Sequence, residues 1–159
     1  MKRIKMILFS HTGNTMRVGE RIAEKLTSAG FQVDIARLEP EERLNFKAEV
    51  ASTKEIPSVD SYDVILLGTP VHGGRMSAPM RYFLEQTSSS QQIPYILFLT
   101  HFFRRGWGVI QTIQELRKLC DGKGGKFLHA TNVQWFSLFR KQAILQAAEE
   151  INTQLSVIR

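Results

Sequence analysis

The sequence predicts a doubly wound α/β fold, in which a parallel sheet of five strands lies between two layers of helices. Short apolar runs alternate along the chain with segments of helical periodicity. Three of these runs are almost entirely apolar, as expected for strands that helices cover on both faces. The length of 159 residues and the hydrophobic share of 43% fit one globular domain over residues 1–159.

The first half of the chain supplies three predicted strands and one helix. The strands are expected at residues 5–9, 31–35 and 64–67, and the second alternates apolar and polar residues as an edge strand does. A helix between the first two strands is indicated by apolar residues at helical spacing: Val18, Ile22, Leu26 and Ala29. Gly30 stands where such a helix would end. Pro40 and the charged residues after it favour a further helix that Pro57 would end.

The second half continues the alternation. Ser77 and the next two residues, Ala and Pro, are typical of a helix start, and a strand is expected at residues 95–99. Apolar residues from Ile110 to Cys120 predict a third helix, followed by a fifth strand at about 126–133. A terminal helix is indicated by Ile144, Ala148, Ile151 and Leu155.

Charge and composition exclude several classes of protein. The formal net charge is +6, and no motif that reads nucleic-acid bases accompanies it, so we interpret the basic residues as solvated surface. No apolar stretch approaches the length of a membrane span. A lone cysteine, Cys120, forms no internal disulfide and no multi-cysteine zinc site, and we expect no metal site. We therefore expect a cytoplasmic protein.

The loop after the first strand is the best candidate for a binding site. It reads Ser10, His11, Thr12, Gly13, Asn14 and Thr15, and it leads directly into the first helix. Three hydroxyls, an amide, a glycine and the N–H groups of a helix start together suit an anion such as phosphate. The alternative is that these side chains only cap the helix.

The same loop excludes other phosphate-handling classes. It carries neither the lysine-containing P-loop pattern nor the three-glycine pattern of a dinucleotide turn. No carboxylate lies near the end of the first strand to hold the magnesium of a receiver domain. Cys120 falls on an apolar helix face rather than in this loop, so a cysteine phosphatase is also excluded.

In two of its loops the chain resembles the flavodoxin family and the wider group of flavodoxin-like FMN proteins. Residues 10–15 are similar to the family's Ser/Thr-x-Thr-Gly-x-Thr signature, which binds the FMN phosphate. Residues 68–79 are similar to the loop that lies against one face of the isoalloxazine ring. The resemblance implies a flavodoxin-like three-layer sandwich with strand order 2-1-3-4-5 and FMN as cofactor. In the second loop it implies these FMN contacts: Thr69, Pro70, Val71, His72, Gly73 and Gly74.

The loop after the fourth strand should form the wall on the other face of the flavin. It is rich in aromatic residues, which lose much by standing in water. Its candidate binding residues are Thr100, His101, Phe102, Phe103, Gly106, Trp107 and Gly108. We expect at least one aromatic residue to stack on the ring, with Trp107 as the first choice.

Two departures from the flavodoxin pattern bear on function. His72 stands where an aromatic residue is common, so on that side the flavin is expected to be more exposed or to meet an imidazole. The resemblance to flavodoxins would imply an acidic surface around the site. Here a basic rim of four arginines is expected instead: Arg75, Arg81, Arg104 and Arg105. Such a rim suits a small anionic donor or acceptor as well as an acidic redox partner protein.

The resemblance therefore implies an FMN-dependent redox protein, in which the cofactor supplies the chemistry and no protein nucleophile is needed. Two subclasses stay open: a carrier that docks on another redox protein, and an oxidoreductase that passes electrons from NAD(P)H to a small acceptor such as a quinone. The alternative from another class is a binding or regulatory module that keeps the fold and has lost FMN.

Overall fold

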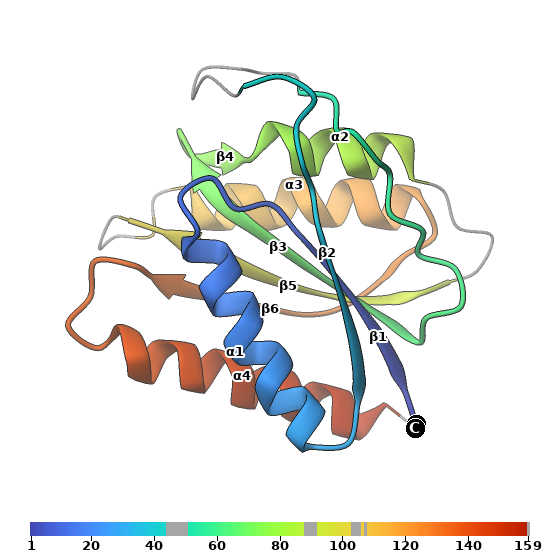
Figure 1. Cartoon of the computed structure of the whole chain (residues 1–159), viewed down its shortest axis with the longest axis vertical. Helices are drawn as coiled ribbons and strands as arrows, with labels where there is room; N and C mark the ends of the chain where they lie inside the picture. The colour runs from blue at the N-terminus through green and yellow to red at the C-terminus, as the bar shows by residue number, and fades with distance from the viewer. Residues whose placement is uncertain (44–50, 88–91, 103–105, 107, 159) are drawn as a thin grey trace.

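The structure, a computed structural model, describes residues 1–43, 51–87, 92–102, 106 and 108–158. Its sheet has the order β2-β1-β3-β5-β6, and each neighbouring pair along it is parallel. The five strands are β1 (Arg3–Leu8), β2 (Gln32–Arg37), β3 (Val64–His72), β5 (Pro94–His101) and β6 (Lys126–Gln134). This order is the predicted one, with β2 at an edge, so the predicted flavodoxin-like architecture is confirmed (Figure 1).

Helices cover both faces of the sheet, as the continuous apolar runs predict. The helices are α1 (Asn14–Ser28), α2 (Ala78–Gln86), α3 (Val109–Gly122) and α4 (Arg140–Val157). Figure 1 shows α1 and α4 together on one face and α2 and α3 on the other. None of the described helices has the length and apolar character needed to cross a membrane.

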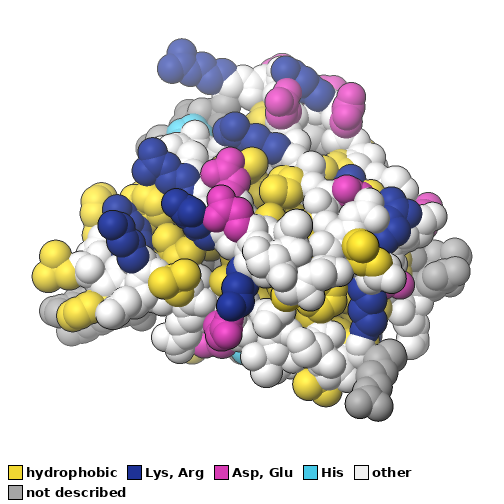
Figure 2. All heavy atoms as spheres, turned by 60° about the horizontal axis from the view of Figure 1, so that its bottom comes forward, with side chains coloured by type: hydrophobic (Ala, Val, Ile, Leu, Met, Phe, Trp, Pro, Cys, Tyr) yellow, Lys and Arg dark blue, Asp and Glu magenta, His cyan; other side chains and the backbone are white. Residues whose placement is uncertain are grey.

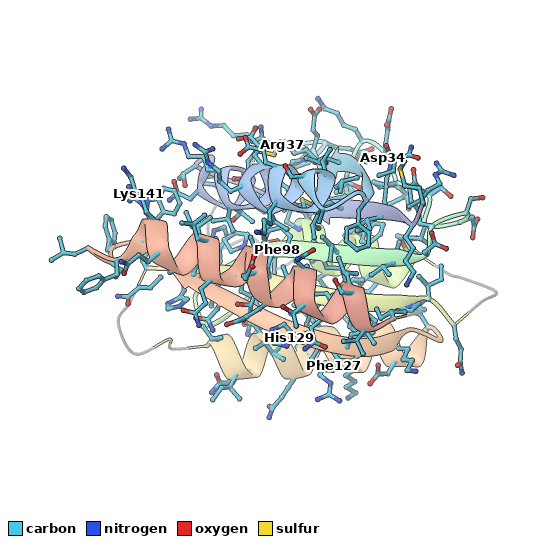
Figure 3. All side chains as sticks on the ribbon, turned by 90° about the horizontal axis from the view of Figure 1, so that it is seen from below. Asp34, Arg37, Phe98, Phe127, His129 and Lys141 are labelled. Atoms are coloured by element: carbon cyan, nitrogen blue, oxygen red, sulfur yellow. The ribbon has the colours of Figure 1, made fainter. Side chains whose placement is uncertain are left out.

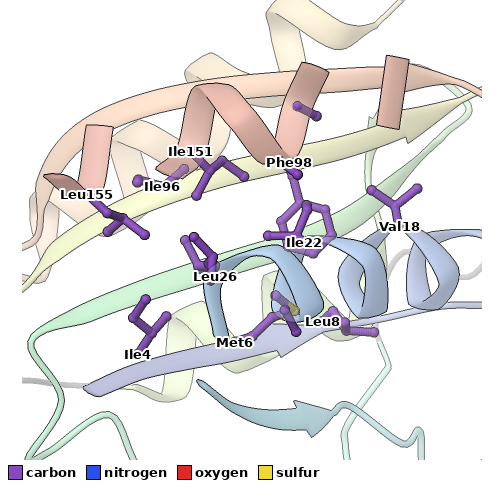
Figure 4. Close-up of a cluster of buried hydrophobic side chains, with 14 of the residues drawn as sticks. Ile4, Met6, Leu8, Val18, Ile22, Leu26, Ile96, Phe98, Ile151 and Leu155 are labelled. Carbon is purple, nitrogen blue, oxygen red and sulfur yellow. The ribbon is translucent and has the colours of Figure 1, made fainter. Parts of the chain in front are cut away.

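Each face of the sheet has its own hydrophobic core. On the face of α1 and α4, Ile22, Leu26, Phe98 and Ile151 are fully buried together (Figure 4). The other core contains residues of α2 and α3 such as Phe83 and Leu116. Burial of this apolar surface is the main force that stabilises the fold, at about 25 cal/mol for each Å² removed from water.

Two local features differ from the predictions. A two-residue strand, β4 (Arg75–Met76), folds back antiparallel on the end of β3, so the second loop is a short hairpin. The helix expected between Pro40 and Pro57 is wrong for the part that is described, because residues 41–43 and 51–57 contain no helix. Instead, Pro40 bridges antiparallel to Thr53. The middle of that segment, residues 44–50, lies outside the described residues.

Candidate functional site

A pocket of about 80 Å³ lies at the carboxyl edge of the sheet, where the loops after β1, β3 and β5 meet. This edge is where open parallel sheets bind ligands. The usual position is beside the strand at which the strand order reverses, and here β2 and β3 lie on opposite sides of β1. Ten residues line the pocket: His11, Thr12, Asn14, Thr15, Pro70, His72, Thr100, His101, Phe102 and Trp135. Nine of these ten are candidates from the sequence, and they come from all three predicted loops.

The first loop presents backbone donors at the start of α1. Gly13 adopts a left-handed conformation, with φ of 90°, just before the helix. The Met16 N–H donates to the Ser10 hydroxyl at 3.1 Å, and the Arg17 N–H makes the first helical bond, to the Gly13 carbonyl. The N–H groups of Asn14 and Thr15 precede that bond and have no acceptor within the helix. The Ser10 side chain therefore caps the helix, whereas the adjacent donors suit an anion.

A buried hydrogen bond joins the first and third loops. The hydroxyls of Thr15 and Thr100 lie 2.8 Å apart, and both residues are buried. Each hydroxyl retains hydrogen-bonding capacity beyond this contact, because a hydroxyl can donate once and accept twice. The bond fixes the start of α1 against the end of β5, and both residues line the pocket.

The second loop is closed by its own side chains. The Thr69 hydroxyl lies 2.9 Å from the Ser77 hydroxyl and accepts the Ser77 N–H at 3.2 Å. Gly73 and Gly74, with φ of 54° and 77°, form the turn between β3 and β4. Of this loop's candidates, Pro70 and His72 line the pocket, whereas the buried Thr69 holds the two ends of the hairpin together.

Two histidines and a phenylalanine cluster beside the pocket. The rings of His11 and His72 are 6.0 Å apart and nearly perpendicular, and Phe9 lies 6.3 Å from His72. Burial lowers the pKa of His72, and repulsion by the His11 charge lowers it further. His72 is therefore mainly a neutral imidazole at pH 7, with one N–H donor and one acceptor nitrogen.

The third loop packs directly against the second. Gly108 has φ of 80°, and a Cβ placed on it would lie only 2.2 Å from the Gly74 Cα. Only glycine allows this approach of two backbones. His101 is buried, and its Nε2 lies 2.8 Å from the Asn132 side-chain oxygen. Phe102 lines the pocket. Phe103 and Trp107, both candidates from the sequence, lie outside the described residues.

Trp135 lines the pocket and was missed by the sequence analysis as a binding residue. Its backbone N–H donates to the His101 carbonyl at 2.7 Å, and the Arg140 guanidinium stacks 4.4 Å from the centre of its ring. Its position could have indicated it, because it stands two residues after the predicted fifth strand, at the edge where parallel strands end. The aromatic wall therefore includes a residue from β6's end as well as from the third loop.

Arg37 is a second residue that the sequence analysis missed. It ends β2, and its guanidinium donates to the Ser10 carbonyl at 2.9 Å, so that a positive charge lies beside the first loop. Figure 3 shows Arg37 on the α1 side of the sheet, near the surface. Its charge is close enough to the loop to favour an anion there.

The expected arginine rim is only partly described. Arg75 is exposed on β4, next to the hairpin turn. Arg81 forms an ion pair with Glu115 that links α2 to α3, so an acidic partner compensates its charge. Arg104 and Arg105 lie outside the described residues.

The fold and this pocket define a flavodoxin-like FMN-binding protein, and comparison with known proteins agrees. A family model described as NADPH-dependent FMN reductase matches residues 8–117. The chain belongs to this family. The match covers the first two loops and β5 with the loop that follows it, the segments that supply nine of the pocket's ten lining residues.

Curated relatives match a shorter part of the chain. An NAD(P)H dehydrogenase (quinone) from Paraburkholderia phymatum is 37% identical over 94 residues, which are 55% of this chain and 47% of the relative. One of the same description from Methylocella silvestris is 33% identical over 93 residues, 54% of this chain and 47% of the relative. The chain spans about half the length of these curated relatives in each match.

Solved structures support the fold. A flavodoxin, WrbA-like protein from Agrobacterium tumefaciens superposes with a TM-score of 0.66 at 21% identity, over 98% of this chain and 99% of that chain. A flavoprotein in complex with FMN from Lactobacillus acidophilus gives a TM-score of 0.67 at 16% identity, over 83% and 93% of the two chains.

The residues around the pocket fit FMN. The hydroxyls and helix-start N–H groups of residues 12–15 are donors for a phosphate, and Phe102 and Trp135 are an apolar surface for an aromatic ring. The pocket is smaller than the roughly 300 Å³ or more of a complete small-molecule site. A ligand as large as FMN would therefore fill the pocket with one part and lie across the loops with the rest.

Proposed function

We propose that the chain is an FMN-dependent oxidoreductase that transfers electrons from NADH or NADPH to a quinone. Bound FMN would supply the redox chemistry, because it accepts a hydride from a nicotinamide and can deliver two electrons to an acceptor. The observation that carries the proposal is one pocket that joins a phosphate-binding type of loop to an aromatic wall. The match to relatives named NAD(P)H dehydrogenase (quinone) supports the choice of donor and acceptor.

The residues of the chain would divide the work of binding. Thr12, Asn14 and the N–H groups at the start of α1 would hold the phosphate. Phe102 and Trp135 would cover apolar parts of the ring system and exclude water from it. His72, mainly neutral at pH 7, would offer an N–H donor or an acceptor nitrogen rather than a positive charge.

A carrier that docks on an acidic redox protein is the second candidate. The excess of basic residues in the second half, 10 against 5 acidic ones in residues 80–159, favours an anionic partner of either kind. A small anionic donor such as NADPH would meet the exposed Arg75. Electrostatic docking of a protein partner would instead depend strongly on salt concentration.

The test is steady-state oxidation of NADH and NADPH by the FMN-loaded protein, with a water-soluble quinone as acceptor and across a salt series. We expect quinone-dependent turnover in which salt raises the KM for the nicotinamide only modestly and leaves kcat nearly unchanged, because few charges meet a small donor. Absence of turnover with either donor, in a protein that still holds FMN, would favour the carrier. A protein that does not bind added FMN would favour the regulatory module.

The cytoplasmic location expected from the sequence stays a prediction.

A further inference from the structure

An exposed apolar patch lies beside the pocket, on the turn between β6 and α4 and on the first turns of α4. It consists of Phe136, Leu138, Phe139 and Leu145, whose exposed fractions are 75%, 100%, 68% and 67%. Isolated exposed apolar residues are ordinary, but four large ones within ten residues are not. The patch begins at the pocket, because the Phe136 ring packs 5.1 Å from that of Phe102, which lines it.

Positive charge accompanies the patch. Arg140 and Lys141 stand in the first turn of α4, and the sequence contains no Asp or Glu from Gly122 through Ala148. Figure 3 labels Lys141 at the N-terminal end of α4. In Figure 2, hydrophobic and basic side chains gather at the left end of the molecule, over the start of α4.

The acidic residues that line a groove together with Leu145 are each paired with a cation. α1 and α4 line a shared surface groove that includes Leu145. In this groove Glu149 forms an ion pair with Lys25 at 2.8 Å, and Glu24 forms one with Arg21 at 2.9 Å. Each carboxylate is therefore matched by a cation of α1. Arg140 and Lys141, at the start of α4, add positive charge beside the apolar side chains.

We propose that this patch docks the protein on an anionic lipid surface, with the apolar side chains in the interfacial region and the basic ones against lipid headgroups. Reversible membrane binding needs both contributions, because neither a few apolar side chains nor a few charges is sufficient alone. The chain presents the two together on one side of the pocket entrance.

Charge argues against a second copy of this chain as the partner. A two-fold interface would place each patch against the same patch of the other copy. Arg140 and Lys141 of both copies would then lie in one contact region without an acidic residue from the same stretch of sequence, at a cost that grows as water is excluded. An anionic bilayer has the opposite sign and an apolar interior, and so complements both properties of the patch.

Docking there would bring the pocket close to the membrane, where lipophilic quinones partition. This consequence rests on the proposed function, whereas the lipid binding itself does not. Binding is therefore measured without nicotinamide or quinone, and it is a separate result from turnover.

The experiment is flotation of the FMN-loaded full chain with vesicles of phosphatidylcholine, with and without phosphatidylglycerol. We expect binding to the anionic vesicles only, and weaker binding at high salt. Leu138→Ser with Leu145→Ser should lower the partition coefficient by about tenfold or more. Lys141→Glu should lower it several-fold. Neither change touches the pocket, so turnover with a soluble quinone should stay as in the wild type.

The matched control is Ile110→Ser on α3, because Ile110 is 67% exposed, like Leu145, but lies on the other layer of helices. It should float like the wild type. The proposal is overturned if the wild type does not bind anionic vesicles, or if the double leucine variant binds as well as the Ile110 control. It is also overturned if sedimentation shows a dimer that the double leucine variant dissociates, since a second copy would then cover the patch.

Discussion

The Thr15 hydroxyl lies 2.8 Å from the Thr100 hydroxyl, and this contact couples two segments that are 85 residues apart in the sequence. Both residues are buried, with 1% and 3% of their surface exposed, so each hydroxyl would lose its partner without gaining water if the other were removed. The start of α1 and the end of β5 are therefore held as one unit at the pocket.

This contact predicts non-additive effects on stability. Thr15→Ala and Thr100→Ala should each lower the free energy of unfolding by about 1–2 kcal/mol, and the double variant should lose less than the sum. Denaturant unfolding of the four proteins measures the coupling. Thr153→Ala is the control, because its exposed hydroxyl donates to the Glu149 carbonyl of its own helix. Strictly additive losses would mean that the two hydroxyls do not interact.

A second prediction concerns the contact between the second and third loops. Gly108→Ala should destabilise the protein and weaken FMN binding, because the new Cβ would lie 2.2 Å from the Gly74 Cα. Gly124→Ala is a matched control: Gly124 has nearly the same φ, 82° against 80°, but nothing within 4 Å of a Cβ. The shared strain cancels in the comparison, so the difference in melting temperature reports the loop contact. Equal losses in the two variants would contradict it.

The third prediction is a pH dependence that arises from His72. Its pKa in the folded protein lies below the ordinary value of about 6.5, so the unfolded chain binds a proton that the folded protein does not. The stability of the protein without FMN should therefore fall as pH decreases from about 6.5 toward the lowered pKa. His72→Gln should reduce this slope. Urea unfolding at several pH values measures it, and an unchanged slope in the variant would exclude His72 as its source.

Trp135 should matter for the flavin ring rather than for the phosphate. Trp135→Leu should weaken FMN and riboflavin by the same factor, on the order of three- to tenfold, because aromatic stacking contributes about 0.5–1.5 kcal/mol beyond area burial. Fluorescence titration of the bound flavin measures both affinities. Trp135→Phe should restore most of the loss. If phenylalanine and leucine bind flavin equally well, the indole does not contact the ring.

The sequence was sufficient for the main architecture because buried parallel strands leave a strong local pattern. Residues 64–67 and 95–99 are apolar throughout, and both lie within central strands. The hairpin strand Arg75–Met76 was not predicted, since two residues carry no periodicity. The helix expected after Pro40 was wrong because a bridge to Thr53, thirteen residues away, decides the structure there.

The pocket was predictable in its loops and less so in its side chains. The order of strands and loops implies that the loops after β1, β3 and β5 meet at one edge, and nine lining residues follow from that alone. Which side chains bond one another does not follow. Nothing local in the sequence indicates that Thr69 closes a hairpin with Ser77, or that Arg37 reaches the Ser10 carbonyl.

The central claim is that the loop at residues 10–15 holds the phosphate of FMN in this pocket. The most direct measurement is calorimetric titration of the flavin-free protein with FMN and with riboflavin, for the wild type and for Thr12→Ala. Thr12 lines the pocket and is exposed, so its loss should leave the fold intact. We predict that the wild type prefers FMN, and that Thr12→Ala weakens FMN by about tenfold while riboflavin affinity is unchanged, because only FMN offers a charged acceptor. Equal affinities for the two flavins in the wild type, or equal losses in the variant, would contradict the claim.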